Sequence, residues 1–376
     1  MRIGVNALFW IPDAMGGTQT YFMNLLRALL RIDPMNTYVV FLNKDGARNF
    51  TIASANLQVQ ICPIPGRTRS LRLLWENLLL PSYVRRSQID LLHSLGYIAP
   101  IALSVPSVIT VPDMIHYIYP DEIEKPKRML WKVLFPVSLR RANHVISISK
   151  SVKGDIVRFF PWAEPKTTPI SLAVDHTLFN LSLPGENSSF ENGKVCQFII
   201  AVASISPHKN IGTLIQAFAQ VQRMWPSLQL VLVGMKTSSA KTLSQLIHTL
   251  SLDAQIQFLG RISDMQLVKL YRSAKVLVFP SLYEGFGLPL LEAMSCGCPV
   301  IASNRSSIPE VVEDSALLFD PEDVAQLTQA VVEVLSSEES RTELVRRGLE
   351  HSAKYTWETT ATETLKVYHR CYEGAG

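Results

Sequence analysis

The second half of the chain alternates short apolar runs with amphipathic stretches of helical spacing. We predict strands at 197–203, 228–233, 256–259, 276–279, 300–302 and 317–319. The helices predicted between and after them cover 211–224, 239–251, 264–273, 288–296 and 321–335. Strands that alternate with helices favour a parallel, doubly wound sheet, in which ligands bind at the carboxyl ends of the strands.

The first half shows the same alternation of apolar and amphipathic stretches, but the boundaries between its elements are less clearly marked. Buried strands are predicted at 2–8, 38–42, 57–61, 89–92, 106–111 and 145–148, with a helix from about Gln19 to Arg31. Residues 168–194 are richer in Pro, Ser, Asn and Gly, which is typical of a hinge. We therefore predict two α/β domains, 1–180 and 181–355, followed by a helix over 356–376.

Most of the candidate ligand-binding residues lie in the segment 276–303, VLVFPSLYEGFGLPLLEAMSCGCPVIAS. Pro289 suits the first turn of a helix, whose N-terminal amides around Gly285, Phe286, Gly287 and Leu288 favour an anion such as a diphosphate. Two carboxylates flank these amides, Glu284 in the loop and Glu292 in the helix. An ionised carboxylate only accepts hydrogen bonds, which suits sugar hydroxyls. The alternative is a helix cap with two solvated acids.

This segment resembles the donor-site signature of the retaining glycosyltransferase family 4, whose E-x7-E motif appears as Glu284 and Glu292. The resemblance implies a GT-B fold, in which two Rossmann-like doubly wound domains face a cleft and the second binds the nucleotide-sugar. It also implies that the last helix packs back on the first domain. Glu292 would hold ribose hydroxyls, and Glu284 hydroxyls of the transferred sugar.

Other positions are assigned on the same resemblance. Lys209 matches a lysine that faces the diphosphate, whereas Ser204 stands where an arginine is common. Arg261 follows a predicted strand and is a further donor-site candidate, as are Gly16 and Gly17 before the first helix. Relatives often have His-Asp where this chain has Pro112-Asp113, so His116 is expected to replace that histidine beside Asp113.

Composition narrows the class of protein. The 376 residues are 47% hydrophobic and 18% charged, as in globular proteins. Five cysteines without paired spacing make a zinc site unexpected, and no two aspartates are separated by one residue, so the chain has no DxD metal motif. We expect an enzyme that needs neither cofactor nor metal, and a cytoplasmic one, because no leader-like or membrane-spanning run is present.

The charge is uneven: residues 1–175 contain 20 Lys and Arg against 12 Asp and Glu, and the remainder 16 against 20. The basic excess lies at 66–88 and 124–143, where it flanks apolar positions that include Trp131 and Phe135. Such helices either pack on the first domain's sheet or lie at an anionic membrane surface, and the two are compatible. We expect peripheral contact with the inner face of the membrane, and no nucleic-acid partner.

The leading hypothesis is a retaining hexosyltransferase that moves a sugar from UDP-glucose, slightly favoured, or GDP-mannose to a saccharide or lipid-linked acceptor. An epimerase or phosphorylase of the same fold is an alternative. A dinucleotide oxidoreductase fails because Gly285-Phe-Gly287 does not continue as G-x-G-x-x-G. An inactive scaffold stays open because Ser204 and Pro112 depart from the family pattern.

Overall fold

The computed structural model describes residues 1–11, 16–66, 68–123, 125–181, 197–235 and 240–374. The chain divides into two compact units, the first made of Met1–Leu172 with Trp357–Gly376 and the second of Ala173–Thr356. The first crossing between the units therefore comes after Leu172, eight residues before the predicted boundary at 180. The C-terminal helix belongs to unit 1.

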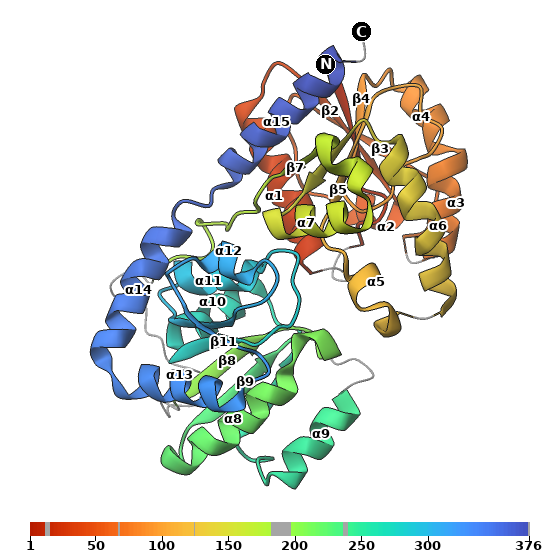
Figure 1. Cartoon of the computed structure of the whole chain (residues 1–376). Helices are drawn as coiled ribbons and strands as arrows, with labels where there is room; N and C mark the ends of the chain where they lie inside the picture. Colours follow the sequence, from red (N-terminus) through yellow and green to blue (C-terminus); the bar gives the residue numbers. More distant parts are fainter. Residues whose placement is uncertain (12–15, 67, 124, 182–196, 236–239, 375–376) are drawn as a thin grey trace. The chain divides into compact units, whose positions relative to one another are not determined.

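Unit 1 is built on a seven-stranded parallel sheet of order β3-β2-β1-β4-β5-β6-β7. Its strands are β1 (Arg2–Asn6), β2 (Thr37–Leu42), β3 (Leu57–Ile61), β4 (Leu91–Ser94), β5 (Ser107–Val111), β6 (His144–Ser147) and β7 (Thr167–Pro169). Its helices are α1 (Gly17–Ile32), α2 (Lys44–Asn49), α3 (Arg69–Leu78), α4 (Leu80–Arg86), α5 (Ile115–Ile118), α6 (Lys125–Arg141), α7 (Lys150–Phe159) and α15 (Trp357–Glu373). Figure 1 shows α15 beside α1, and both helices pack together.

Unit 2 has a six-stranded parallel sheet of order β10-β9-β8-β11-β12-β13. Its strands are β8 (Phe198–Val202), β9 (Gln229–Val233), β10 (Ile256–Gly260), β11 (Val276–Phe279), β12 (Val300–Ser303) and β13 (Leu317–Phe319). Its helices are α8 (Ile211–Met224), α9 (Ala240–Thr249), α10 (Asp264–Ser273), α11 (Leu288–Ser295), α12 (Ile308–Val312), α13 (Val324–Ser336) and α14 (Glu338–Ser352). In both sheets the order reverses beside the first strand, as in doubly wound folds.

The predicted α/β class is confirmed, with local corrections. β4 begins and ends two residues later than predicted, because His93 and Ser94 are buried strand residues with side-chain partners, not the start of a loop. α13 begins at Val324 because the Asp323 side chain accepts a hydrogen bond from the Gln326 amide and caps the helix there. β7 and α14 were not predicted.

The basic helices of unit 1 do pack on its core through one face. Leu73 and Trp75 of α3 are buried, and so are Trp131, Phe135 and Leu139 of α6. The two helices are tied to one loop, because Asn77 Oδ1 accepts from the Ile101 amide and Ser138 Oγ accepts from the Ala99 amide. In the described part of the chain, no helix is both long and apolar enough to cross a membrane.

Candidate functional site

The carboxyl ends of β8 and β11 flank the point where the strand order of unit 2 reverses. In doubly wound sheets this is the position at which a ligand binds. The loop after β8 carries Lys209, and the loop after β11 carries Glu284. The structure brings both side chains together there, with Lys209 Nζ 2.6 Å from Glu284 Oε1.

This ion pair is largely shielded from solvent: the side chains of Lys209 and Glu284 are 17% and 12% exposed. The interpretation of Glu284 as a solvated acid is therefore excluded. A charge-assisted hydrogen bond in such a setting is short and strong. It holds a cation and an acceptor side by side at the mouth of the sheet, where an anionic group and a hydroxylated group of one ligand could each find a partner.

The loop from Glu284 to α11 is rigid for identifiable reasons. Gly287 has φ of 111°, and a Cβ there would lie 2.8 Å from Leu290 Cδ1, so only glycine fits. Ser307 Oγ donates to the carbonyl oxygens of Glu284 and Phe286, at 3.0 Å each. Pro289 lies in the first turn of α11, as predicted.

Glu292 lies one turn further along α11 and is buried. The Tyr271 hydroxyl of α10 donates to its Oε2 at 3.3 Å. Burial raises the pKa of Glu292 to about 7, against a smaller lowering by the Tyr271 hydrogen bond. Burial and the neighbouring Glu292 charge also raise the pKa of Tyr271 well above its ordinary value. A carboxyl of this kind changes protonation near neutral pH, so it too is not a solvated surface acid.

The remaining unit 2 candidates lie less centrally. Ser204, after β8, is half-buried, and its Oγ is 3.3 Å from that of Ser206. Arg261 is exposed and follows β10, which is two strands away from β8 in the sheet. Thus the structure groups Lys209 with Glu284 and leaves Arg261 at the edge of the sheet.

In unit 1, Asp113 and His116 follow β5 and share one neighbour. The Tyr97 hydroxyl donates to Asp113 Oδ2, and the Ile115 amide donates to Asp113 Oδ1 at 3.0 Å. The rings of His116, Tyr97 and Trp131 contact one another, with centroid distances of 5.3 Å from His116 to Tyr97, 4.1 Å from His116 to Trp131 and 4.9 Å from Tyr97 to Trp131. Tyr97 has φ of 39°, a left-handed conformation that is uncommon for a bulky residue.

The Gly16-Gly17 pair begins α1. Gly16 is the residue before the helix; among the described residues, no side chain caps the helix and a Cβ at Gly16 would meet no atom within 4 Å. Residues 12–15 of the preceding loop lie outside the described residues. In the part of the chain that is described, no group of three or more His, Cys, Asp and Glu side chains is arranged to hold a metal ion.

Sequence reasoning missed three contributors to the site. Asn210, Ser307 and Tyr271 each hold a loop or carboxylate in place through hydrogen bonds. Asn210 is adjacent to Lys209 in the sequence, and that adjacency was the only available signal. The serine and the tyrosine lie more than a dozen positions from their partners, so no local spacing pointed to them.

Comparisons with known proteins place the chain in a class. It matches "Glycosyl transferases group 1" over residues 187–351 and "Glycosyltransferase Family 4" over residues 15–178. O-antigen chain mannosyltransferase B of Escherichia coli is 30% identical over 268 residues, 70% of each chain. The serotype-specific mannosyltransferase WbdA of the same organism is 31% identical over 62% of this chain, which spans only 30% of that longer protein.

Solved structures agree on the fold. Sucrose-phosphate synthase from Thermosynechococcus elongatus superposes with a TM-score of 0.78 at 21% identity, over 100% of both chains. Anabaena Alr3699/HepE in complex with UDP-glucose gives 0.72 at 19% identity, over 98% of this chain and 100% of that one. The protein is a glycosyltransferase of the GT-B fold. It belongs to the group 1 and family 4 glycosyltransferases, as the E-x7-E segment indicated.

Proposed function

We propose that the protein transfers a hexose from a nucleotide-sugar to a saccharide or lipid-linked acceptor, with retention at the anomeric carbon. The observation that carries the proposal is the shielded Lys209–Glu284 pair where the strand order of unit 2 reverses. In this assignment Lys209 turns to the diphosphate when the donor binds. Glu284, released from the lysine, accepts from hydroxyls of the transferred sugar.

The reaction requires positive charge at the place where the leaving diphosphate develops negative charge. Breaking the anomeric C–O bond leaves the bond's electron pair on a diphosphate oxygen. A positioned cation and helix N-terminal amides stabilise that charge without a metal. Lys209 and the amides of Gly287 and Leu288 at the start of α11 are the groups assigned to this task. The acceptor oxygen attacks the face that the diphosphate leaves, and a phosphate oxygen takes its proton.

The other candidates take supporting roles in the proposal. Glu292 holds ribose hydroxyls in its ionised form. Asp113 and His116, which belong to unit 1, are assigned to the transferred sugar. Tyr97 contacts both of these side chains and fixes them. Gly16 and Gly17 are assigned to the diphosphate side of the same unit, and Ser204 and Arg261 to the periphery of the donor site.

The proposal also concerns which nucleotide-sugar is the donor, UDP-glucose or GDP-mannose. The sequence alone slightly favoured UDP-glucose, and HepE, a neighbour by fold, is described in complex with that donor. Three sequence relatives at 30% or 31% identity are named as mannosyltransferases, two of them of O-antigen chains. The names of these nearer relatives support GDP-mannose and a place in polysaccharide assembly.

The test is calorimetric titration of the wild type and Glu292→Ala with UDP, GDP, UDP-glucose and GDP-mannose. A ligand that binds only the folded state also raises the melting temperature. We expect one nucleotide to bind selectively and to lose affinity in the variant. If folded wild-type protein bound none of the four, the inactive scaffold would replace this proposal.

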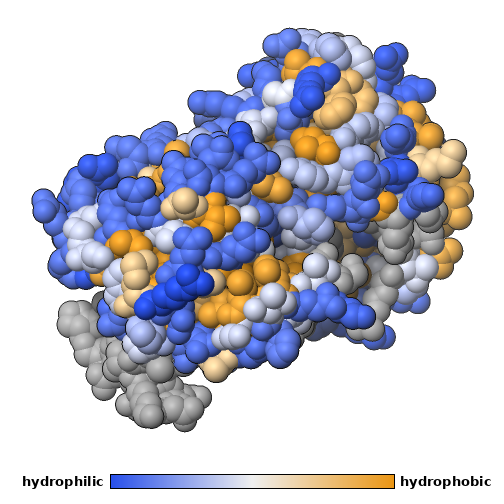
Figure 2. All heavy atoms as spheres, turned by 60° about the horizontal axis from the view of Figure 1, so that its bottom comes forward, coloured by the Kyte–Doolittle hydropathy of each residue, from blue (hydrophilic) through white to orange (hydrophobic). Residues whose placement is uncertain are grey.

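We also propose that unit 1 docks on an anionic membrane through an apolar ridge on its two basic helices. The ridge consists of exposed side chains on and just after α3 and on α6: Leu71, Leu74, Leu78, Leu79, Met129, Leu130, Val133 and Val137. Leu78 is 67% exposed and Met129 74%. Figure 2 shows hydrophobic residues at the surface along its right edge, the side on which Figure 1 draws α3, α4 and α6.

Charge supports a lipid surface as the occupant. Lys125, Lys132 and Arg141 of α6 are exposed beside the ridge, which fits anionic headgroups around an inserted apolar stripe. Other basic residues have protein partners instead: Arg72 with Glu76, and Arg128 with Asp121. Arg67 lies outside the described residues, as do the side chains of Arg69 and Lys127.

Vesicle sedimentation tests the ridge. Wild-type protein should bind vesicles with anionic lipid more tightly than neutral ones, and Leu74→Ser with Val133→Ser should release it. Met265→Ser is the matched control, because Met265 is similarly exposed (58%) but lies in unit 2. Equal binding by the ridge variant would overturn the membrane assignment, as would a ridge-dependent dimer that ignores vesicles.

A further inference from the structure

Asn210 stands directly after Lys209, at the junction between the 3₁₀ turn Pro207–Lys209 and α8. Its φ of 54° and ψ of 34° lie in the left-handed region, which asparagine adopts more readily than most residues. The turn ends there through a hydrogen bond from the Asn210 amide to the Pro207 carbonyl, 3.0 Å long. The backbone direction that aims Lys209 therefore depends on the conformation of this one residue.

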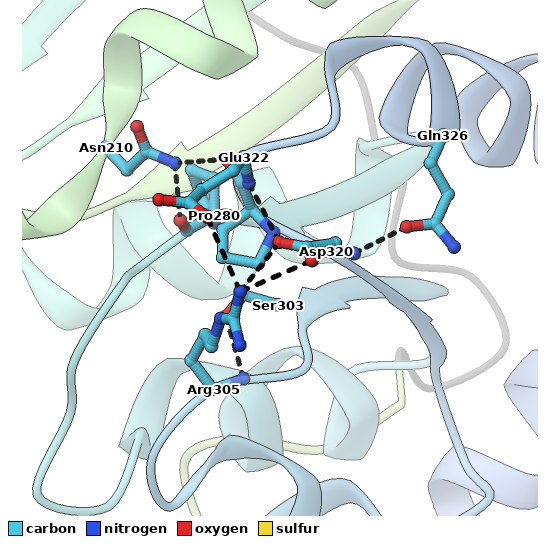
Figure 3. Close-up of polar contacts among 8 residues, drawn as sticks. Asn210, Pro280, Ser303, Arg305, Asp320, Glu322 and Gln326 are labelled. Atoms are coloured by element: carbon cyan, nitrogen blue, oxygen red, sulfur yellow. Dashed lines mark hydrogen bonds and ion pairs between the residues drawn. The ribbon is translucent and has the colours of Figure 1, made fainter.

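The side chain of Asn210 reaches two other loops. Its Nδ2 donates to the carbonyl oxygen of Pro280 at 3.2 Å and to that of Pro321 at 2.8 Å. Its Oδ1 accepts from Thr213 Oγ1 at 2.8 Å. Figure 3 shows the amide pointing from the start of α8 toward the Pro280 loop. A neutral amide is needed for this pattern, because a carboxylate of the same shape has no proton to donate.

The loop that holds Pro321 is itself fixed. Arg305 Nη2 lies 3.1 Å from Asp320 Oδ1 and 3.7 Å from Glu322 Oε2. The Asp320 amide donates to Gln326 Oε1 at 2.6 Å. These contacts hold the segment after β13 against the segment after β12, as the dashed lines in Figure 3 show. The Pro321 carbonyl is thus a firm anchor for Asn210.

The contacts close into a ring of four loops. Ser306 Oγ, one residue past Arg305, donates to the Glu284 carbonyl at 2.7 Å. The Leu282 amide donates to the His208 carbonyl at 2.8 Å, which joins the Glu284 loop back to the Lys209 loop. Every loop at the carboxyl ends of β8, β11, β12 and β13 is therefore bonded to at least two of the others. The Lys209–Glu284 pair lies within this ring.

We propose that Asn210 is a positioning residue, which fixes Lys209 against Glu284 by tying the loop after β8 to the loops after β11 and β13. The inference rests on the proposed function in that the lysine is assigned to the leaving diphosphate. A shift of about 1 Å in a positioned group can lower turnover about a hundredfold. A transition-state contact should affect kcat more than KM.

Two substitutions separate the amide from the backbone. Asn210→Gly keeps a residue that tolerates the left-handed conformation but removes both donated hydrogen bonds. Asn210→Asp keeps the shape but places a carboxylate against two carbonyl oxygens. We expect both to lower kcat about a hundredfold with a smaller change in the KM of the donor, and the aspartate variant to be no more active than the glycine variant.

The control is Ser251→Gly, because Ser251 also has a left-handed backbone (φ of 57°) in unit 2 and follows α9, away from the ring. It carries the same backbone change without touching these loops, so its kcat should stay at the wild-type level. A loss of kcat in Asn210→Gly that Ser251→Gly shared would overturn the inference.

A second readout needs no donor. The shielded ion pair should protect the Lys209 amine from an acylating reagent, and mass spectrometry can follow that one lysine. If the loops shift in Asn210→Gly and Asn210→Asp, Lys209 loses its charge-assisted hydrogen bond to Glu284. Its modification rate should then rise at least about fivefold. Unchanged Lys209 reactivity would overturn the positioning role. Failure of the proposed function would show differently, as wild-type protein that turns over no nucleotide-sugar while the reactivity still differs.

Discussion

The two sheets share a strand order, but the polar side chains near the carboxyl ends of their central strands differ in charge. In unit 2 the ends of β8 and β11 meet in an ion pair, Lys209 with Glu284. In unit 1 the neighbouring strands β4 and β5 carry a neutral network: His93 bonds to Thr110 at 2.8 Å and to Tyr368 of α15 at 2.7 Å. Unit 2 places charge beside its first strand, where the strand order reverses, whereas unit 1 uses a neutral network one strand pair further along to dock its last helix.

Burial shifts the pKa of a titratable group in each unit, and the two shifts have opposite directions. Burial lowers the pKa of His93 to about 3, so it stays neutral in the folded protein. Burial raises the pKa of Glu292 to about 7. Below pH 6.5 the unfolded chain protonates His93 first, so this group makes unit 1 less stable in acid. Between pH 4.5 and 7 the folded chain keeps the Glu292 proton, so this group makes unit 2 less stable as pH rises.

The largest test of the comparison removes the charge from unit 2. Lys209→Met should lower turnover about 10²–10³-fold, because a positioned cation is the main stabiliser proposed for the departing diphosphate. Glu284→Ala should also lower turnover, through lost sugar contacts. Initial rates with the donor found by titration measure both.

The control for that experiment is Lys241→Met, an exposed lysine of α9, which should keep the wild-type rate. Wild-type turnover in Glu284→Ala would mean that this carboxylate neither contacts the sugar nor is needed to position the lysine.

The second test concerns Glu292. Glu292→Gln keeps the acceptor for the Tyr271 hydroxyl and removes a carboxylate that is buried when ionised. At about pH 4.5 the variant and wild type should be equally stable, and by about pH 8 the variant should be more stable by about 3 kcal/mol. Urea unfolding at both pH values measures the difference.

The same variant should bind the donor more weakly at about pH 8, because the ionised acceptor for ribose hydroxyls is gone. In the wild type, donor affinity should fall as pH drops below about 7, where Glu292 takes up its proton. A variant that is stabilised but binds normally would keep the burial argument and remove Glu292 from the donor site.

How much of this followed from the sequence can be judged at particular residues. Regular alternation gave each described strand of unit 2 to within one residue at each end, since most of their apolar runs are bounded by Gly, Pro or Asp. The motif spacing predicted Glu284 and Glu292 as special positions. It could not predict that Glu284 pairs with Lys209, 75 positions away, because that contact depends on which strands become neighbours in the sheet.

Local patterns failed where an element is mostly polar or where burial is decided at a distance. α14 was missed because its sequence, EESRTELVRRGLEHS, buries few apolar side chains. β4 was placed too early because His93 and Ser94 look like loop residues until the partners from α15 and β1 are known. The sequence left open whether the apolar positions of α3 and α6 pack on the sheet or face a membrane. In the described part of the chain, one apolar face packs on the core and a second is exposed.

The smallest test returns to the neutral network of unit 1. Tyr368→Phe removes the hydroxyl that bonds to His93 Nδ1 and leaves that buried nitrogen without this partner. The cost should be about 1–2 kcal/mol of stability, since the polar atom stays desolvated. Because α15 belongs to unit 1, hydrogen exchange should rise in α15 and β4. Donor affinity, which the proposal assigns mainly to groups of unit 2, should stay unchanged. His93 and Thr110 remain bonded in this variant, so the fold should persist. A loss of donor affinity as large as the loss of stability would show that the two sheets are coupled, and that charge in one and docking in the other are not separate devices.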